Sequence, residues 1–274
     1  MARRIFITSS SNPRLKGVRS LRRCRRRDDA FLAEGYRQVA CALEAGVRIR
    51  ELYLAEALCL GAYESDLALR AERNGAAVVE LSATAFQSIS SHIRPDGIAA
   101  VVERWTTGLD DLRLGLDPLV LVAEAVERPG NLGTIVRSAC GAGVDALVVA
   151  DGRTDLFHPE TVRGSVGTLF RLQVAESTTD AAVHWLRESA LRIVVAAPEA
   201  GRSCWDADLR GGTAVVVGNE RYGVSPAWLG AADETIRIPM PGPADSLNVA
   251  VASGIVLFEA ARQRAHTESL QGSS

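Results

Sequence analysis

Four continuous runs of apolar residues in the second half of the chain restrict its fold more than any other feature. They occupy 118–123, 146–150, 193–197 and 214–217, and they contain only Ala, Val, Leu, Ile and Pro. A strand with one face in water alternates apolar and polar residues, whereas a strand of a parallel sheet is buried on both faces and reads as a continuous apolar run. The runs therefore predict an α/β domain with a parallel sheet, and helices are expected at 132–141, 178–189 and 248–264.

The first hundred residues follow a different pattern and read as a smaller α/β unit. Amphipathic helices are expected at 15–24 and 39–45, followed by short strands at 49–54, 78–81 and 98–102 with helices between these strands. A polar stretch with glycines and acidic residues comes next and reads as a linker. The predicted division is 1–104 for the N-terminal domain, 105–117 for the linker, 118–266 for the larger domain and 267–274 for a flexible tail.

A net charge of −2 conceals a strongly basic N-terminus. Residues 1–27 contain ten Lys and Arg and neither Asp nor Glu. Such a cluster attracts phosphate groups, and arginine also stacks on unpaired bases, so we expect this segment to contact RNA. An arginine-rich helix can also be no more than a solvated face. The residues assigned to RNA binding here are Arg14, Lys16, Arg22, Arg23, Arg25 and Arg26.

The cysteines and the hydropathy pattern argue against several other classes of protein. The five cysteines are an odd number without C-x-x-C spacing, which speaks against a disulfide framework or a zinc site. The sequence has no apolar stretch of the length that a membrane-spanning helix needs. The basic N-terminus is not followed by the apolar region of a secretory signal. We therefore expect a cytoplasmic protein with no metal site and no membrane attachment.

Three polar segments, at 131–137, 218–223 and 238–248, each follow a predicted strand. Taken singly, each has an ordinary structural explanation: a helix cap, a turn and a strand ended by prolines. In an open parallel sheet, however, ligands bind outside the carboxyl ends of the strands, so the three segments are expected to meet at one site.

Two of the segments carry further expectations about helix starts. The segment at 131–137 should open a helix, whose first N–H groups favour an anion such as phosphate. In the last segment Ser246 is expected to cap a helix that begins near Leu247. Asn248 would then lie in the first turn of an otherwise apolar helix, where packing alone does not explain an amide.

In their order and spacing the three segments resemble the motifs of the SpoU (TrmH-like) RNA 2′-O-ribose methyltransferases of the SPOUT superfamily. The motifs read Asn-x-Gly-x-Ile-x-Arg, Gly-x-Glu-x-x-Gly and Ile-Pro-Met-x-Gly followed by Ser-Leu-Asn-Val. A fourth segment, 163–170, is similar to the family's Arg-x-Ser-x-Gly. The resemblance covers 118–264. Residues 1–104 resemble, more loosely, the L30e-like RNA-binding domain of the rRNA-modifying branch.

The resemblance implies a catalytic domain with a C-terminal trefoil knot, an exception to the rule that chains are not knotted, and a homodimer with its sites near the interface. It implies that S-adenosylmethionine binds in the knot and that no metal is needed. The implied cofactor-binding residues are Val217, Gly218, Ile238, Met240 and Leu247. The implied catalytic residues are Arg137, which would activate the ribose 2′-hydroxyl, with Asn131, Glu220, Ser246 and Asn248. Arg163 joins the expected RNA-binding residues.

The expected function is therefore S-adenosylmethionine-dependent 2′-O-methylation of RNA, with 23S rRNA as the expected substrate. A tRNA substrate is the nearest alternative, and a ribosome-assembly factor that binds RNA without catalysis is an alternative of another class. Some relatives in antibiotic-producing bacteria protect their own ribosomes, so a role in resistance stays open. Gln173 and Asp245 depart from the family pattern, which affects the identity of the substrate more than the activity.

Overall fold

The computed structural model describes residues 4–23 and 28–271, and their contacts divide the chain into two compact units. The N-terminal unit comprises Met1–Trp105 and Asp155–Arg171, and the C-terminal unit comprises Thr106–Thr154 and Leu172–Ser274. Asp155–Arg171 lies inside the range 118–266 that the sequence suggests is one domain, yet it makes its contacts with the first hundred residues.

An aromatic cluster explains why this inserted segment belongs to the N-terminal unit. The ring of Phe157 lies 4.7 Å from those of both Phe31 and Trp105, measured between ring centres. Phe170, from the other end of the segment, stacks on Phe31 at 6.1 Å. Arg104 forms an ion pair with Asp155, and its guanidinium lies 4.8 Å from the centre of the Phe157 ring. Burial of these rings fixes the segment by both ends.

The N-terminal unit is built on a five-stranded mixed sheet in the order β1-β4-β3-β5-β2. Its strands are β1 (Ile5–Ile7), β2 (Ala30–Glu34), β3 (Ile49–Leu54), β4 (Ala77–Leu81) and β5 (Ile98–Glu103). Its helices are α1 (Pro13–Leu21), α2 (Tyr36–Glu44), α3 (Tyr63–Arg73), α4 (Ala83–Ile89) and α6 (Pro159–Ser165), with short 3-10 turns η1 (Glu56–Leu58) and η3 (Thr168–Phe170). Leu15 and Phe86 join α1 and α4 to the core over the sheet.

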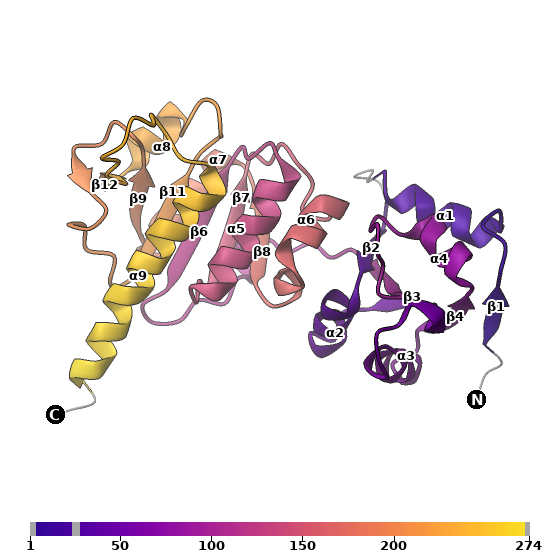
Figure 1. Ribbon diagram of the computed structural model, residues 1–274. Helices are drawn as coiled ribbons and strands as arrows, with labels where there is room; N and C mark the ends of the chain where they lie inside the picture. Colours follow the sequence, from indigo (N-terminus) through magenta and orange to yellow (C-terminus); the bar gives the residue numbers. More distant parts are fainter. Residues whose placement is uncertain (1–3, 24–27, 272–274) are drawn as a thin grey trace. The chain divides into compact units, whose positions relative to one another are not determined.

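The C-terminal unit contains a seven-stranded sheet in the order β10-β12-β9-β11-β6-β7-β8, and every pair is parallel (Figure 1). The strands are β6 (Leu119–Glu124), β7 (Ala146–Ala150), β8 (Gln173–Ser177), β9 (Arg192–Ala196), β10 (Arg202–Ser203), β11 (Thr213–Val217) and β12 (Glu234–Arg237). The predicted parallel sheet is thus confirmed. The apolar runs form β6, β7, β9 and β11, whereas the strands towards the edges carry charged residues and gave no such signal.

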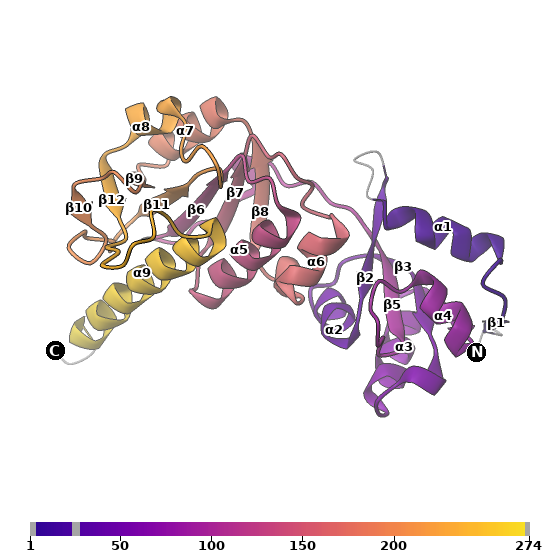
Figure 2. The same cartoon turned by 45° about the horizontal axis from the view of Figure 1, so that its top comes forward.

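Helices cover both faces of this sheet. On one face α5 (Pro129–Gly141) lies beside α9 (Val249–Gln271), and α7 (Thr179–Glu188) and α8 (Pro226–Ala231) cover the other (Figures 1 and 2). Beneath α7 and α8, Trp228 is fully buried and its Nε1 donates to Thr179 Oγ1 at 3.1 Å. Because α9 runs on to Gln271, the tail predicted at 267–274 begins within a helix, and 272–274 lie outside the described residues.

The segment predicted as a linker packs against the C-terminal unit. It contains the 3-10 turn η2 (Leu109–Asp111), and Leu112 is buried in the core of the unit. The side chain of Gln173 holds it in place: Oε1 accepts from the Arg113 N–H at 2.9 Å, and Nε2 donates to the Arg113 carbonyl at 2.9 Å. This pairing gives a structural reason for the unusual glutamine at position 173.

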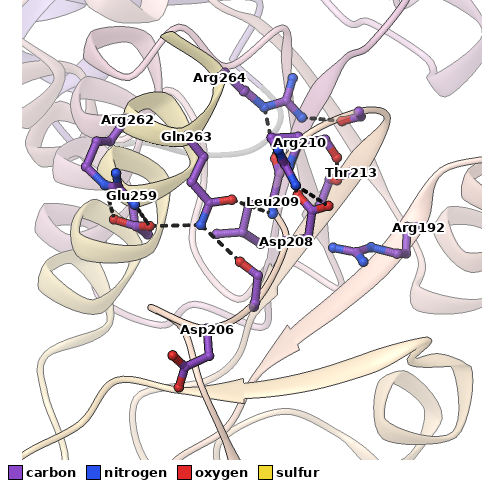
Figure 3. Close-up of polar contacts among 12 residues, drawn as sticks. Arg192, Asp206, Asp208, Leu209, Arg210, Thr213, Glu259, Arg262, Gln263 and Arg264 are labelled. Atoms are coloured by element: carbon purple, nitrogen blue, oxygen red, sulfur yellow. Dashed lines mark hydrogen bonds and ion pairs between the residues drawn. The ribbon is translucent and has the colours of Figure 1, made fainter. Parts of the chain in front are cut away.

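Side chains from the later turns of α9 anchor it to the amino-terminal edge of the sheet (Figure 3). Gln263 accepts from the Leu209 N–H at 2.8 Å and donates to the Ala207 carbonyl at 2.9 Å. The guanidinium of Arg264 donates to four carbonyls, those of Asp117, Pro118, Leu209 and Gly211. Burial lowers the pKa of Arg264. Both side chains therefore fix the helix to the segments that lead into β6 and β11.

Replacing Arg264 by methionine should destabilise the C-terminal unit by about 1–3 kcal/mol, because several half-buried carbonyls lose their donor while most of the side-chain volume is kept. The free energy of unfolding is measured by urea titration. Arg210→Met is the matched control, since Arg210 is exposed and pairs with Asp208 only two residues away. Equal unfolding midpoints for the two variants would show that the Arg264 contacts contribute nothing.

Candidate active site

The three polar segments lie at the carboxyl-terminal edge of the seven-stranded sheet. The first follows β6, the second follows β11 and the third follows β12. β6 and β11 are direct neighbours, and only β9 separates β11 from β12. After β6 the chain adds β7 and then β8 on one side of β6. All later strands, from β9 to β12, lie on the other side of β6. Strand order thus reverses next to β6, which is where open α/β sheets bind their ligands.

Hydrogen bonds connect one residue of each segment. The Glu220 carboxylate accepts from Asn131 Nδ2 at 2.7 Å, and Asn131 Oδ1 accepts from Asn248 Nδ2 at 3.1 Å. Glu220 also accepts from the backbone N–H groups of Glu127 and Arg128, at 3.1 and 3.2 Å. The structure thereby brings together three of the five residues expected to be catalytic. We call Glu220, Asn131 and Asn248 the amide–carboxylate network.

These hydrogen bonds keep Glu220 ionised. Its burial alone would raise the pKa of the carboxyl group, but the bonds from Asn131 and from the two backbone N–H groups outweigh burial, and the pKa lies below its ordinary value. An ionised Glu220 can only accept, so it fixes which end of the Asn131 amide points towards it. The carbonyl end of Asn131 is then left for Asn248.

The starts of the two helices at the site differ from the sequence expectation. The N-cap of α5 is Arg128, followed by Pro129, so the helix begins before Asn131. The anion expected near this helix start is supplied by the chain itself, as the Glu220 carboxylate. For α9 the expected cap at Ser246 was wrong: the helix begins at Val249, and Asn248 Oδ1 accepts from the Ala250 N–H at 2.9 Å. Asn248 therefore caps α9 and donates to Asn131 with the same amide.

Arg137 and Ser246 stand outside this network. Arg137 lies on α5, roughly two turns beyond Asn131, and its side chain is exposed. Within 4–23 and 28–271, no hydrogen bond or ion pair holds its guanidinium. Ser246 is exposed in the segment before α9. Arg137 therefore offers an unengaged positive charge on the same helix as Asn131.

One of the residues expected to hold a cofactor, Gly218, lies at a close backbone crossing. At Gly218 a Cβ atom would lie 2.3 Å from the carbonyl carbon and oxygen of Gly223, so only glycine fits. Val217, directly before it, is buried at the end of β11. Ile238 and Met240 are half-buried, and Leu247 is 38% exposed. Backbone polar groups and apolar side chains of this kind could hold the base and ribose of an adenosyl group.

Sequence reasoning missed two residues that shape these loops. Asn219 Oδ1 accepts from the N–H groups of Arg221 and Tyr222, and its Nδ2 donates to the Ala125 carbonyl at 2.9 Å. Asparagine after glycine at a strand end is a turn signal that could have indicated this role. Glu124 is 5% exposed and accepts from the Ser225 N–H at 2.8 Å. Glu124 is the last residue of the apolar strand β6, and no sequence pattern indicates that its partner is the Ser225 N–H.

In the described part of the chain, no group of three or more His, Cys, Asp or Glu residues could hold a metal ion. None of the four cysteines that the structure describes is in a disulfide, and burial raises the pKa of Cys59 and of Cys204 to about 11. In 4–23 and 28–271 no helix is both long and apolar enough to cross a membrane.

Asn131→Asp should break the amide–carboxylate network above mildly acidic pH. The new carboxylate would repel Glu220, so the pKa of the pair rises on folding and the destabilisation grows as pH increases through that raised range. At lower pH a shared proton restores one hydrogen bond. Thermal unfolding at pH 5 and pH 8 measures the effect. Asn74→Asp, at an exposed helix end, is the control, and an equal pH dependence in both variants would contradict the proposed pairing.

Two family models match the chain. The SpoU rRNA Methylase family model matches residues 118–258, and the MRM3-like substrate binding domain model matches residues 12–100. Each half of the chain therefore resembles a known module.

Relatives and solved structures extend this similarity over nearly the whole chain. The 23S rRNA (guanosine(2553)-2′-O)-methyltransferase RlmP of Bacillus subtilis is 31% identical, over 92% of this chain and 97% of the relative. The 23S rRNA (uridine(2479)-2′-O)-methyltransferase of Streptomyces viridochromogenes is 33% identical, over 96% and 93%. The AdoMet-bound rRNA methyltransferase of Sinorhizobium meliloti superposes with a TM-score of 0.85 at 30% identity, covering 94% of this chain and 97% of that one.

Proposed function

The chain belongs to the SpoU rRNA methylase family, and we propose that it transfers a methyl group from S-adenosylmethionine to a ribose 2′-hydroxyl of 23S rRNA. The observation that carries this proposal is the amide–carboxylate network, which joins the three segments, one of which also contains the exposed Arg137. Both relatives named above act on 23S rRNA, and each aligns with this chain over more than nine-tenths of its own length.

Methyl transfer asks the protein mainly to position two reactants. S-adenosylmethionine supplies a methyl group already activated on its sulfonium sulfur. Backbone groups at Gly218, Ile238 and Leu247 would hold it, with Val217 and Met240 alongside. Attack by the ribose oxygen would form the bond to the methyl carbon as the carbon–sulfur bond breaks, and the hydroxyl proton would pass to solvent. The positive charge of Arg137 would stabilise the negative charge that develops on that oxygen.

Arg137→Ala should lower methyl transfer by about a hundredfold or more, because an electrostatic contact to the reacting oxygen is lost. Cofactor binding should stay within a few-fold of the parent chain. Transfer is measured with tritiated S-adenosylmethionine on unmethylated 23S rRNA, and cofactor binding by calorimetry. Arg210→Ala, before the amino end of β11, is the control. Full activity of Arg137→Ala would overturn the mechanism.

Cofactor binding and two further experiments separate the alternative functions. An assembly factor without catalysis would show no cofactor binding at millimolar concentration. Mapping ribose methylation over rRNA and tRNA from cells with and without the protein distinguishes the two RNA substrates. A role in antibiotic resistance stays a prediction, which drug sensitivity of the same two strains would test.

The N-terminal unit is proposed to bind the RNA. Arg22 and Arg163, far apart in sequence, line one small cleft together with His92. Lys16 and Arg23 are exposed, and Arg25 and Arg26 lie outside the described residues. Arg14 is less suited than expected, because Glu51 accepts from both its Nε and its Nη2, at 3.0 and 2.6 Å. Binding through such a surface should weaken steeply as salt rises.

The knot, the dimer and the cytoplasmic location also belong to this proposal. An apolar strip at the start of α9 supports the dimer: Leu247 is 38% exposed, Val251 51% and Phe258 55%. Val251 and Phe258 are two turns apart and therefore lie on the same side of the helix. Exposed apolar side chains grouped in this way are typical of subunit interfaces.

Phe258→Asp should dissociate the proposed dimer and reduce methyl transfer with it, because a charge is costly in a subunit interface. Sedimentation velocity at micromolar concentration measures the assembly state. Leu229→Asp is the matched control, since Leu229 is 45% exposed on α8, which covers the opposite face of the sheet. A parent chain that sediments as a monomer would remove the dimer from the proposal.

A further inference from the structure

A second cavity lies beside the amide–carboxylate network. It is a cleft of about 850 Å³ in the C-terminal unit, near the carboxyl ends of β6 and β7. Its volume is in the range of sites that hold small molecules. The residues that matter for its chemistry are Glu124, Glu127, Asp180, Tyr222 and Ser225, with Arg153 at its edge.

The cleft shares two loops with the network. Glu127 and Asn219 line it, and they are the chain neighbours of Arg128 and Glu220. The Glu220 carboxylate accepts from the Glu127 N–H at 3.1 Å, so one hydrogen bond separates the network from the cleft. A base is attached directly to its ribose. A ribose held at the network therefore has its base within reach of the cleft.

The lining of the cleft favours a neutral group rich in N–H donors. The lining includes four carboxylates, those of Glu124, Glu127, Asp151 and Asp180, and one guanidinium, that of Arg153, so a phosphate would be repelled. In the described part of the chain, no hydrogen bond or ion pair engages the carboxylate of Glu127 or of Asp180. The buried Ser225 Oγ also has no partner there.

An aromatic ring stands at the cleft. Tyr222 lines it and is 77% exposed, and the Arg221 guanidinium lies 5.6 Å from the centre of its ring. Exposed tyrosine and arginine planes are the groups on which proteins stack unpaired bases. Stacking at Tyr222 and unpaired acceptors within the cleft together match a planar base.

We propose that this cleft receives the base of the target nucleotide and that this base is guanine. Guanine presents its N1–H and N2 amino group side by side, so one carboxylate can accept two parallel hydrogen bonds from it. Uracil has one N–H between two carbonyl oxygens, which the carboxylates repel, and adenine and cytosine each place an acceptor beside their amino group. The base would have to leave its stack to enter. This inference rests on the proposed function, since it assigns the same site its target.

Binding of free nucleosides tests the cleft without any methyl transfer. Guanosine, inosine and uridine are offered to the full chain, and affinities are measured by saturation-transfer NMR. Inosine lacks the N2 amino group and should bind about tenfold more weakly than guanosine, and uridine at least as weakly. Asp180→Asn and Tyr222→Ala should each weaken guanosine binding several-fold, whereas Asp110→Asn, at an exposed position, should not. Equal affinity for the three nucleosides would overturn the proposal.

The methylated product provides the second readout. 23S rRNA methylated by the full chain is digested to nucleosides, and 2′-O-methylguanosine is the expected product in mass spectrometry. Only 2′-O-methyluridine, -cytidine or -adenosine would overturn the assignment of guanine. Selective guanosine binding without methylation of any RNA would support the assignment of the cleft as a guanine site and would reject the proposed methyltransferase function. Methylation of RNA together with unselective nucleoside binding would support the proposed function and would reject the cleft as a guanine site.

Discussion

The Glu220 carboxylate is the group on which the organisation of the site depends. It accepts from Asn131 and from the N–H groups of Glu127 and Arg128, and so ties the loop after β11 to the loop after β6. Because it stays ionised, it fixes the Asn131 amide, which in turn accepts from Asn248 at the start of α9. One acceptor therefore sets the positions of three segments that are far apart in sequence.

This arrangement requires α9 to be fixed along its length, because Asn248 both caps the helix and enters the network. Gln263 and Arg264 hold the later turns to the segments before β6 and β11, at the other edge of the sheet. A shift of α9 along its axis would break hydrogen bonds at both edges. The contacts at both edges therefore hold Asn248 in a fixed position relative to the sheet.

The sequence predicted those features whose signal is local or repeated. Continuous apolar runs identified four of the seven strands, and motif order placed Asn131, Glu220 and Asn248 in one site. It did not predict that Asn248 caps α9, because Ser246 is an equally good capping residue by type. Nor did it assign Asp155–Arg171 to the N-terminal unit, since the burial of Phe157 against Phe31 and Trp105 depends on contacts distant in sequence.

On the proposed assignments, charge divides the two parts of RNA recognition between the units. The basic residues near the start of the chain suit phosphates, which carry no information about the base. The cleft beside the network is acidic and would repel a phosphate, so it suits an uncharged base that has left its stack. We therefore expect a substrate that binds tightly through its phosphates to be methylated only where a base with suitable donors enters the cleft. Affinity and choice of nucleotide then rest on different residues and can change independently.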